Sequence, residues 1–215
     1  MNCGFGNLDT LKRHLLAGSL AGETRFDSVI KTVGLAVAGL IEGHTNRRLG
    51  YAAGDTIVFN ALRRIFYLPR FPVCGVTSVA TRAETTATWL VESGQPTMVN
   101  YETGLVDFGS ELGDENVQVR VLWTGGYWFE TLEPDDSGYP SSKPTHVDPT
   151  WDAVAALPDA LQGAWLLQCE YLWAARDKLG MGLVDAPGKQ TTLGDLKLSP
   201  LVEKMLMPYV RYQMT

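Results

Sequence analysis

Apolar residues recur at intervals of three and four near the N-terminus, which is the spacing of an amphipathic α-helix. A first helix is predicted by four leucines at this spacing: Leu8, Leu11, Leu15 and Leu16. Asn7 can cap that helix because its side chain can accept a hydrogen bond from a backbone N–H, and Lys12 is expected on the polar side. A second helix is predicted from Glu23 to Leu49, with Gly50 as its C-terminal stop. Two helices joined by a short break favour an antiparallel hairpin.

Between Asp55 and Trp128 the period shortens to two, as in strands whose side chains alternate between two faces. Short alternating runs, such as the one that contains Val119 and Val121, are separated by turn residues at intervals of roughly ten. This pattern indicates an antiparallel sandwich or small barrel. The segment Glu102-Thr103-Gly104 predicts a tight hairpin in which the glycine supplies a positive φ.

The helical spacing returns after a stretch with four prolines, residues 131–156, which predicts a linker or long loop. From Leu157 to about Gly180 the chain carries large apolar side chains on more than one helical face, including Trp165 and Trp173. Such a helix is buried on several sides or lies in an assembly interface. Ser199 and Pro200 are typical of the start of a last helix. Helices at both ends and strands between them predict an α+β fold.

Composition narrows the classes of function. The 215 residues are 45% hydrophobic and 20% charged, which is ordinary for a soluble globular protein. The net charge is −6, and residues 51–135 hold eleven acidic residues against five basic ones. Proteins that bind nucleic acid through its phosphates usually carry the opposite sign.

The cysteines and the N-terminus suggest where the protein is made. Cys3, Cys74 and Cys169 lie far apart, without zinc or disulfide-framework spacing, so we expect reduced thiols and cytoplasmic synthesis. The N-terminus lacks the pattern of a signal peptide. The longest uncharged apolar run, residues 32–41, is about half the length that a membrane span needs, so no membrane association is expected.

No local motif assigns a catalytic, cofactor-binding or metal-ligating residue, because G-x-S-x-G and H-E-x-x-H are both missing from the sequence. The densest acidic cluster is Asp107, Glu111, Asp114 and Glu115. Its carboxylates could hold a divalent cation or serve a hydrolase, although the spacing is not that of an EF-hand; the alternative is a solvated loop between strands. The pairs Arg47-Arg48 and Arg63-Arg64 could contact phosphate, or could lie at a helix end and a strand rim respectively.

The C-terminal segment, residues 198–215, is rich in methionine and tyrosine, which suit a surface that must adapt to a partner. We expect it to make few contacts within the domain and to order on docking. The aromatic helix before it adds tryptophans, which are frequent in protein interfaces. The candidate interface residues are Leu201, Met205, Leu206, Met207, Tyr209, Val210, Tyr212, Trp165 and Trp173.

Several segments resemble, in the same order, the head–tail connector (adaptor) proteins of tailed bacteriophages. The likeness spans most of the chain, and its order and spacing are more specific than any single motif. The segments that carry it are Leu8–Lys12, Ile41–Leu49, Phe66–Val73, Val76–Val79, Val119–Tyr127 and Leu157–Leu161.

The resemblance implies a helical bundle built from both ends of the chain, with the antiparallel β-sandwich or small barrel inserted between. It also implies a structural virion protein, neither an enzyme nor a cofactor carrier. Copies form a ring, typically of twelve, that docks on the portal protein of the DNA-filled head, receives a distal neck or tail protein, and continues the DNA channel. The expected parts are an N-terminal helical part (1–52), a β insertion (53–130), the proline-rich linker (131–156), a C-terminal helical part (157–197) and a portal-docking segment (198–215).

Two roles are open for the acidic run around Glu111. It could line the channel and repel passing DNA, an effect screened beyond about 10 Å at 0.1 M salt. Facing outward, it could instead select a protein partner by charge. Two other classes of protein remain as alternatives: a monomeric β-sandwich module that binds a ligand on its aromatic side chains, and a carboxylate-dependent hydrolase.

Overall fold

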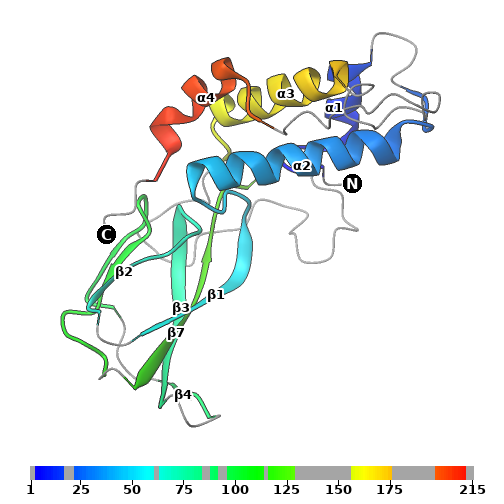
Figure 1. Cartoon of the computed structure of the whole chain (residues 1–215). Coiled ribbons are helices and arrows are strands. Elements are labelled where there is room, and N and C mark those ends of the chain that lie inside the picture. Colours follow the sequence, from blue (N-terminus) through cyan, green and yellow to red (C-terminus); the bar gives the residue numbers. More distant parts are fainter. Residues whose placement is uncertain are drawn as a thin grey trace, which may run out of the picture. The chain divides into compact units, whose positions relative to one another are not determined.

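The computed structural model describes residues 3–16, 22–60, 63–83, 88–91, 96–113, 116–128, 156–175 and 197–211 (Figure 1). Within these ranges the chain is α+β, with helices and antiparallel sheets, which confirms the predicted class. The described residues fall into two compact units. We call them the helical unit (up to Asn46, and from Leu157 onward) and the β unit (Arg47 to Trp128, with Ala156). The rest of the predicted linker, residues 131–155, lies outside the described residues.

The helical unit contains α1 (Leu8–Leu15), α2 (Asp27–Thr45), α3 (Asp159–Ala174) and α4 (Pro200–Leu206), followed by a 3₁₀ turn, η2 (Met207–Tyr209). Helix α3 packs against each of the other three helices (Figure 1). The core they share is made of leucine, isoleucine, valine, alanine and cysteine side chains with one phenylalanine and one tryptophan. Its largest fully buried members are Leu11, Ile30, Ile41, Leu161, Trp165 and Leu206.

The helix ends follow local capping chemistry. The Thr10 N–H donates to Asn7 Oδ1 at 2.7 Å, so the predicted cap of α1 is confirmed. The prediction that the second helix runs to Leu49 and stops at Gly50 is wrong, because α2 ends at Thr45. Asn46 takes the left-handed conformation (φ 51°) and its N–H donates to the carbonyls of the last turn. Asparagine tolerates this conformation better than most residues, and so it ends the helix earlier than the glycine would.

A glycine-lined contact fixes the centre of the helical unit. The Trp165 indole Nε1–H donates to the Gly34 carbonyl of α2 at 2.9 Å. A Cβ on Gly34 would collide with the Cys3 carbonyl oxygen and would lie 2.9 Å from Leu11 Cδ2, and a Cβ on Gly6 would lie 2.9 Å from the Trp165 ring. Gly6 and Gly34 therefore let backbone approach backbone and ring, which only a residue without a side chain permits.

One charged residue was expected in solvent and is buried instead. Lys12 Nζ lies 2.7 Å from Asp27 Oδ1, and the lysine side chain is 6% exposed. The ammonium belongs to the last turn of α1 and the carboxylate to the first turn of α2. Each charge is favourable at its own helix end, because it opposes the partial charge of the helix dipole there.

The β unit holds two antiparallel sheets. The four-stranded sheet has the order β1 (Ala52–Asn60), β7 (Val117–Gly125), β3 (Val73–Ala83), β4 (Leu90–Val91). The three-stranded sheet has the order β2 (Ile65–Tyr67), β6 (Leu105–Asp107), β5 (Met98–Asn100). The predicted hairpin at 102–104 joins β5 to β6, with Gly104 at φ 71°.

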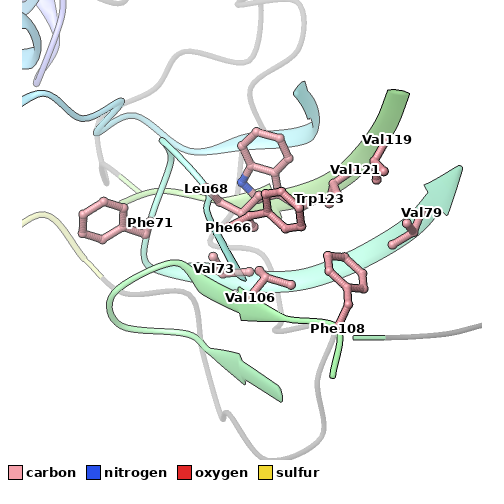
Figure 2. Close-up of a cluster of buried hydrophobic side chains, with 10 residues drawn as sticks. All are labelled: Phe66, Leu68, Phe71, Val73, Val79, Val106, Phe108, Val119, Val121 and Trp123. Carbon is pink, nitrogen blue, oxygen red and sulfur yellow. The ribbon is translucent and has the colours of Figure 1, made fainter. Parts of the chain in front are cut away.

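Both sheets contribute to one apolar core, which Figure 2 shows around Trp123. Phe66 and Val106 come from the three-stranded sheet, and Val79 and Val121 come from the four-stranded one. The Trp123 indole is fully buried, and its Nε1–H donates to the Arg70 carbonyl at 3.1 Å. The alternate residues of each strand therefore point to the outer faces of the sheets.

Gly34→Ala should destabilise the protein by about 3 kcal/mol, at the upper end of the cost of overpacking a core, because the added methyl group meets backbone rather than a movable side chain. Urea unfolding monitored by circular dichroism measures the change. Gly39→Ala in the same helix is the matched control, since its Cβ would have open space around it, and it should stabilise by about 1 kcal/mol. Equal stability of the two variants would contradict the packing described here.

Candidate assembly surfaces

The structure divides the predicted interface residues into core and surface. Trp165 and Leu206 are fully buried in the helical unit, so their assignment to a partner interface is wrong: each packs inside its own chain. Leu201 and Met207 are 60% and 62% exposed. Tyr212 lies outside the described residues. The remaining four are partly buried: Met205, Tyr209, Val210 and Trp173.

The C-terminal segment is anchored to the helical unit by a buried glutamine, Gln168 of α3. Its Nε2 donates to the Lys197 carbonyl and its Oε1 accepts from the Ser199 N–H, both at 2.9 Å. At the far end of the segment the Arg211 N–H donates to the Thr45 carbonyl at 2.9 Å. The expectation of few contacts within the domain is therefore wrong for residues 197–211.

Helix α4 buries one stripe and exposes another. Val202 and Leu206, one turn apart, are fully buried, whereas Leu201 is exposed. The helix has only seven residues, so periodicity over two turns could not decide which stripe faces α3. The consequence is that Leu201 and Met207 are free of the core and available on the surface.

Helix α3 is apolar on more than the face that it buries, as the sequence predicted. Leu161, Trp165 and Leu172 point into the core, while Leu167 and Tyr171, one turn apart, are exposed. The β unit also exposes large apolar side chains. They are Val58, Leu90 and Val91 on the four-stranded sheet, and Ile65, Tyr67 and Met98 on the three-stranded sheet. Exposed apolar groups on both units are candidate contacts for other chains.

Of the acidic run, Asp107 has a structural role. Its Oδ1 lies 3.1 Å from Arg64 Nε and accepts from the Gly109 N–H at 2.7 Å. Glu111 is exposed, and Asp114 and Glu115 lie outside the described residues. In the part of the chain that the structure describes, no group of three or more His, Cys, Asp and Glu side chains is placed to hold a metal ion.

The arginine pair after α2 is structural and does not form an exposed helix end. Arg47 is 7% exposed; its guanidinium lies 3.6 Å from the Phe71 ring centroid, and Nη2 donates to the Phe71 carbonyl at 2.8 Å. Arg48 lies 3.1 Å from Asp55, which also accepts from Arg70 Nε at 2.8 Å. Sequence spacing gave no signal for this cluster, because Arg70 and Asp55 meet only through the fold.

The titration of Asp55 reflects these contacts. Burial raises its pKa, but the hydrogen bond from Arg70 and the charges of Arg70 and Arg48 outweigh burial, so the pKa lies below its ordinary value. Burial acts alone on the Cys74 thiol and raises its pKa to about 11. Burial also raises the pKa of Cys169, and Cys3 adds to that shift. The three cysteines form no disulfide bond and are buried, which agrees with the predicted reduced thiols. None of the described helices is long and apolar enough to cross a membrane.

Comparison with known proteins gave matches among solved structures alone: no family model and no curated protein matches the chain. A chain in the neck of an empty GTA particle, computed with C6 symmetry, has a TM-score of 0.63 and 16% identity over 98% of this chain and 92% of that one. A chain in the virion of a native gene transfer agent (GTA) particle has a TM-score of 0.61 and 16% identity, with the same coverage. One in the neck of a native GTA particle, computed with C12 symmetry, has a TM-score of 0.55 and 18% identity over 97% and 90%. The chain therefore shares a fold with neck components of phage-like particles, which confirms the resemblance at the level of fold.

Gln168→Leu should destabilise the protein by about 1–3 kcal/mol, because it leaves the Lys197 carbonyl and the Ser199 N–H without their side-chain partner. Release of the segment should also speed proteolytic cleavage between residues 197 and 211, measured by mass spectrometry of timed digests. Gln162→Leu on the same helix is the control and should change neither quantity. Cleavage of the Gln168 variant at the wild-type rate would show that the two Gln168 hydrogen bonds do not hold the segment.

Asp55→Asn should lower the free energy of unfolding by about 1–3 kcal/mol at pH 7, since Arg70 loses its charged partner. Because the folded pKa is lowered, the carboxylate stabilises the protein above its ordinary pKa of 3.8, and that contribution is lost as the pH falls through the folded value. The difference between wild type and variant should thus shrink as the pH falls from 7 to below 3.8. Guanidinium unfolding across that range measures it, with the exposed Glu102→Gln as control; a constant difference would argue against the ion pair.

Proposed function

We propose that this chain is a structural protein of the neck of a tailed phage or phage-like virion. In this role copies form an adaptor ring that joins the portal of the DNA-filled head to the next neck or tail component and continues the DNA channel. The observation that carries the proposal is the fold that this chain shares with GTA neck chains over nearly the full length of both chains. The sequence motifs that resemble connector proteins support it independently.

Two observations support a ring: the symmetry of the related necks and the exposed apolar side chains of this chain. The related necks were computed with C6 and C12 symmetry, and we propose a homo-oligomer of twelve copies here. A cyclic ring needs a heterologous interface, in which two different surfaces of each copy meet. Exposed apolar side chains on both the helical unit and the β unit supply candidate surfaces.

The helical unit and the β unit then take the roles of connector bundle and insertion. The C-terminal segment, residues 198–215, is the portal-docking part, and Leu201 and Met207 are its exposed anchors. Gln168 holds the root of this segment in place, so the anchors are presented on a fixed helix before docking. A docking element that is ordered in advance loses less conformational entropy on binding.

The proposed role is structural and involves no catalysis or cofactor. The acidic run supports this, because Asp107, one of the four carboxylates that a hydrolase would use, is held by Arg64 and the Gly109 N–H. The acidic excess of residues 51–135 suits a channel part that does not bind passing DNA.

Electron microscopy of the purified protein, alone and mixed with the portal ring of the same phage, tests the function directly. We expect a cyclic ring that stacks coaxially on the portal. A protein that stays monomeric under both conditions would overturn the proposal and would favour a monomeric binding module.

Leu201→Ser combined with Met207→Ser should weaken attachment to the portal by about tenfold or more while the chain stays folded, because both side chains are exposed and only the docked state buries them. Surface plasmon resonance on immobilised portal measures the affinity. Lys204→Ser, exposed on the same helix, is the control. Wild-type affinity of the double variant would place the portal contact elsewhere.

A further inference from the structure

Strand β1 forms one edge of the four-stranded sheet and lacks the usual protection of an edge. It is nine residues long, and no described strand pairs with its outer side. Its second half, residues 56–60, contains no charged residue, no proline and no glycine. Natural proteins usually shorten or charge such a strand, because its unpaired N–H and C=O groups would otherwise pair with another chain.

The edges of the three-stranded sheet are protected in this way. Its edge strands, β2 and β5, have only three residues each. The exposed Arg63 and Arg64 directly precede β2. The contrast makes β1 the described edge that is best suited to accept a strand from another chain.

Exposed apolar side chains lie at both edges of the four-stranded sheet and not in its middle. Val58 of β1 is 48% exposed. Leu90 and Val91 of β4, at the opposite edge, are 66% and 72% exposed. None of the described residues of the central strands, β3 and β7, is a large exposed apolar residue. The apolar groups that this sheet leaves exposed are thus concentrated where a further strand would be added.

The two edge strands run in opposite directions. β1 is antiparallel to β7, β7 to β3, and β3 to β4, so β4 is antiparallel to β1. A second copy placed beside the first in the same orientation therefore brings its β1 antiparallel to β4 of the first copy. Copies repeated head to tail extend one sheet in which every pair of neighbouring strands is antiparallel.

The pairing register predicts which side chains meet across the new contact. One row of the sheet contains Val58, Arg120, Ala80 and Val91, and the next row contains Phe59, Val119, Thr81 and Leu90. If the rows continue from copy to copy, Val91 lies beside Val58 of the next copy, and Leu90 lies beside its Phe59. A shift of two residues would place Val91 beside Thr56 or Asn60 instead, so the continuous register pairs the most apolar groups.

We propose that β4 of one copy pairs with β1 of the next copy of this chain, so that the four-stranded sheets join into one continuous sheet around the ring. The inference rests on the proposed ring and deepens it by naming the two strands that close it. Because β4 and β1 are different edges of the same sheet, the contact is heterologous, as cyclic closure requires. Backbone hydrogen bonds hold the strands together, and the apolar cross-strand pairs fix the register.

Pairing of β1 with β1 of a second copy is the less favoured arrangement. Such a contact has a two-fold axis and stops at a dimer. It also leaves Leu90 and Val91 of β4 exposed, whereas the head-to-tail contact covers both edges of every copy.

Cysteine crosslinking tests which strands meet. In Val58→Cys/Val91→Cys, a bismaleimide too short to reach across the four strands of one copy should produce covalent species longer than a dimer on a denaturing gel. Each single-cysteine variant should give only the wild-type background, because Cys3, Cys74 and Cys169 are buried. Covalent dimers from Val58→Cys alone would show pairing of β1 with β1 and would overturn the proposal. Rings that form without any crosslink in the double variant would overturn it as well.

Charge substitutions test the register. Val58→Glu and Val91→Lys should each weaken assembly by about tenfold, because the new contact then buries a charge without a partner. Val58→Glu/Val91→Lys in one chain should restore assembly, since opposite charges attract across neighbouring strands. Native mass spectrometry, with and without the portal ring, measures the species. Met98→Glu, at a 52% exposed position on an edge of the other sheet, is the control and should assemble as wild type does.

The outcomes separate this inference from the proposed function. If wild type forms rings and both single charge variants form them equally well, the strand pairing is overturned and the ring stands. A defect that the double charge variant does not relieve overturns the pairing of Val58 with Val91. If wild type forms no ring with or without portal, both proposals fail. Unfolding transitions like that of wild type show that each variant is folded.

Discussion

The close approach of Trp165 to Gly34 is the constraint on which the helical unit depends. The indole hydrogen bond ties α3 to the backbone of α2, and the same ring lies against Gly6 of the N-terminal segment. A tryptophan surrounded by backbone can be fully buried only if its N–H finds an acceptor and its neighbours lack side chains. Three segments far apart in sequence are therefore fixed by one side chain, and α4 is added to this assembly through Gln168 of the same helix.

The large apolar side chains of the terminal helices fall into a buried group and an exposed group. The buried group, which includes Trp165 and Leu206, packs within a single copy and stabilises the helical unit. The second group, Leu201 and Met207 above all, is exposed. It lies on the C-terminal segment, whose start is held by Gln168. Because the second group is not needed for the core, its side chains can be changed without loss of the fold.

The β unit shows a similar division between its interior and its two outer faces. One core serves both sheets (Figure 2), so strand alternation decides which side chains lie on the outer faces. The Arg70–Asp55 ion pair, for example, holds two charges within the unit.

The sequence by itself determined the α+β class, the Asn7 cap, the Gly104 hairpin and the start of α4 at Pro200, because each depends on neighbours within a few residues. Only the tertiary structure decided which face of α4 is buried and that Lys12 is buried beside Asp27. Seven residues are too few for periodicity to choose a stripe, and an ion pair between separate helices leaves no mark in local spacing. These features follow from contacts between distant segments, which exist only once the chain has folded.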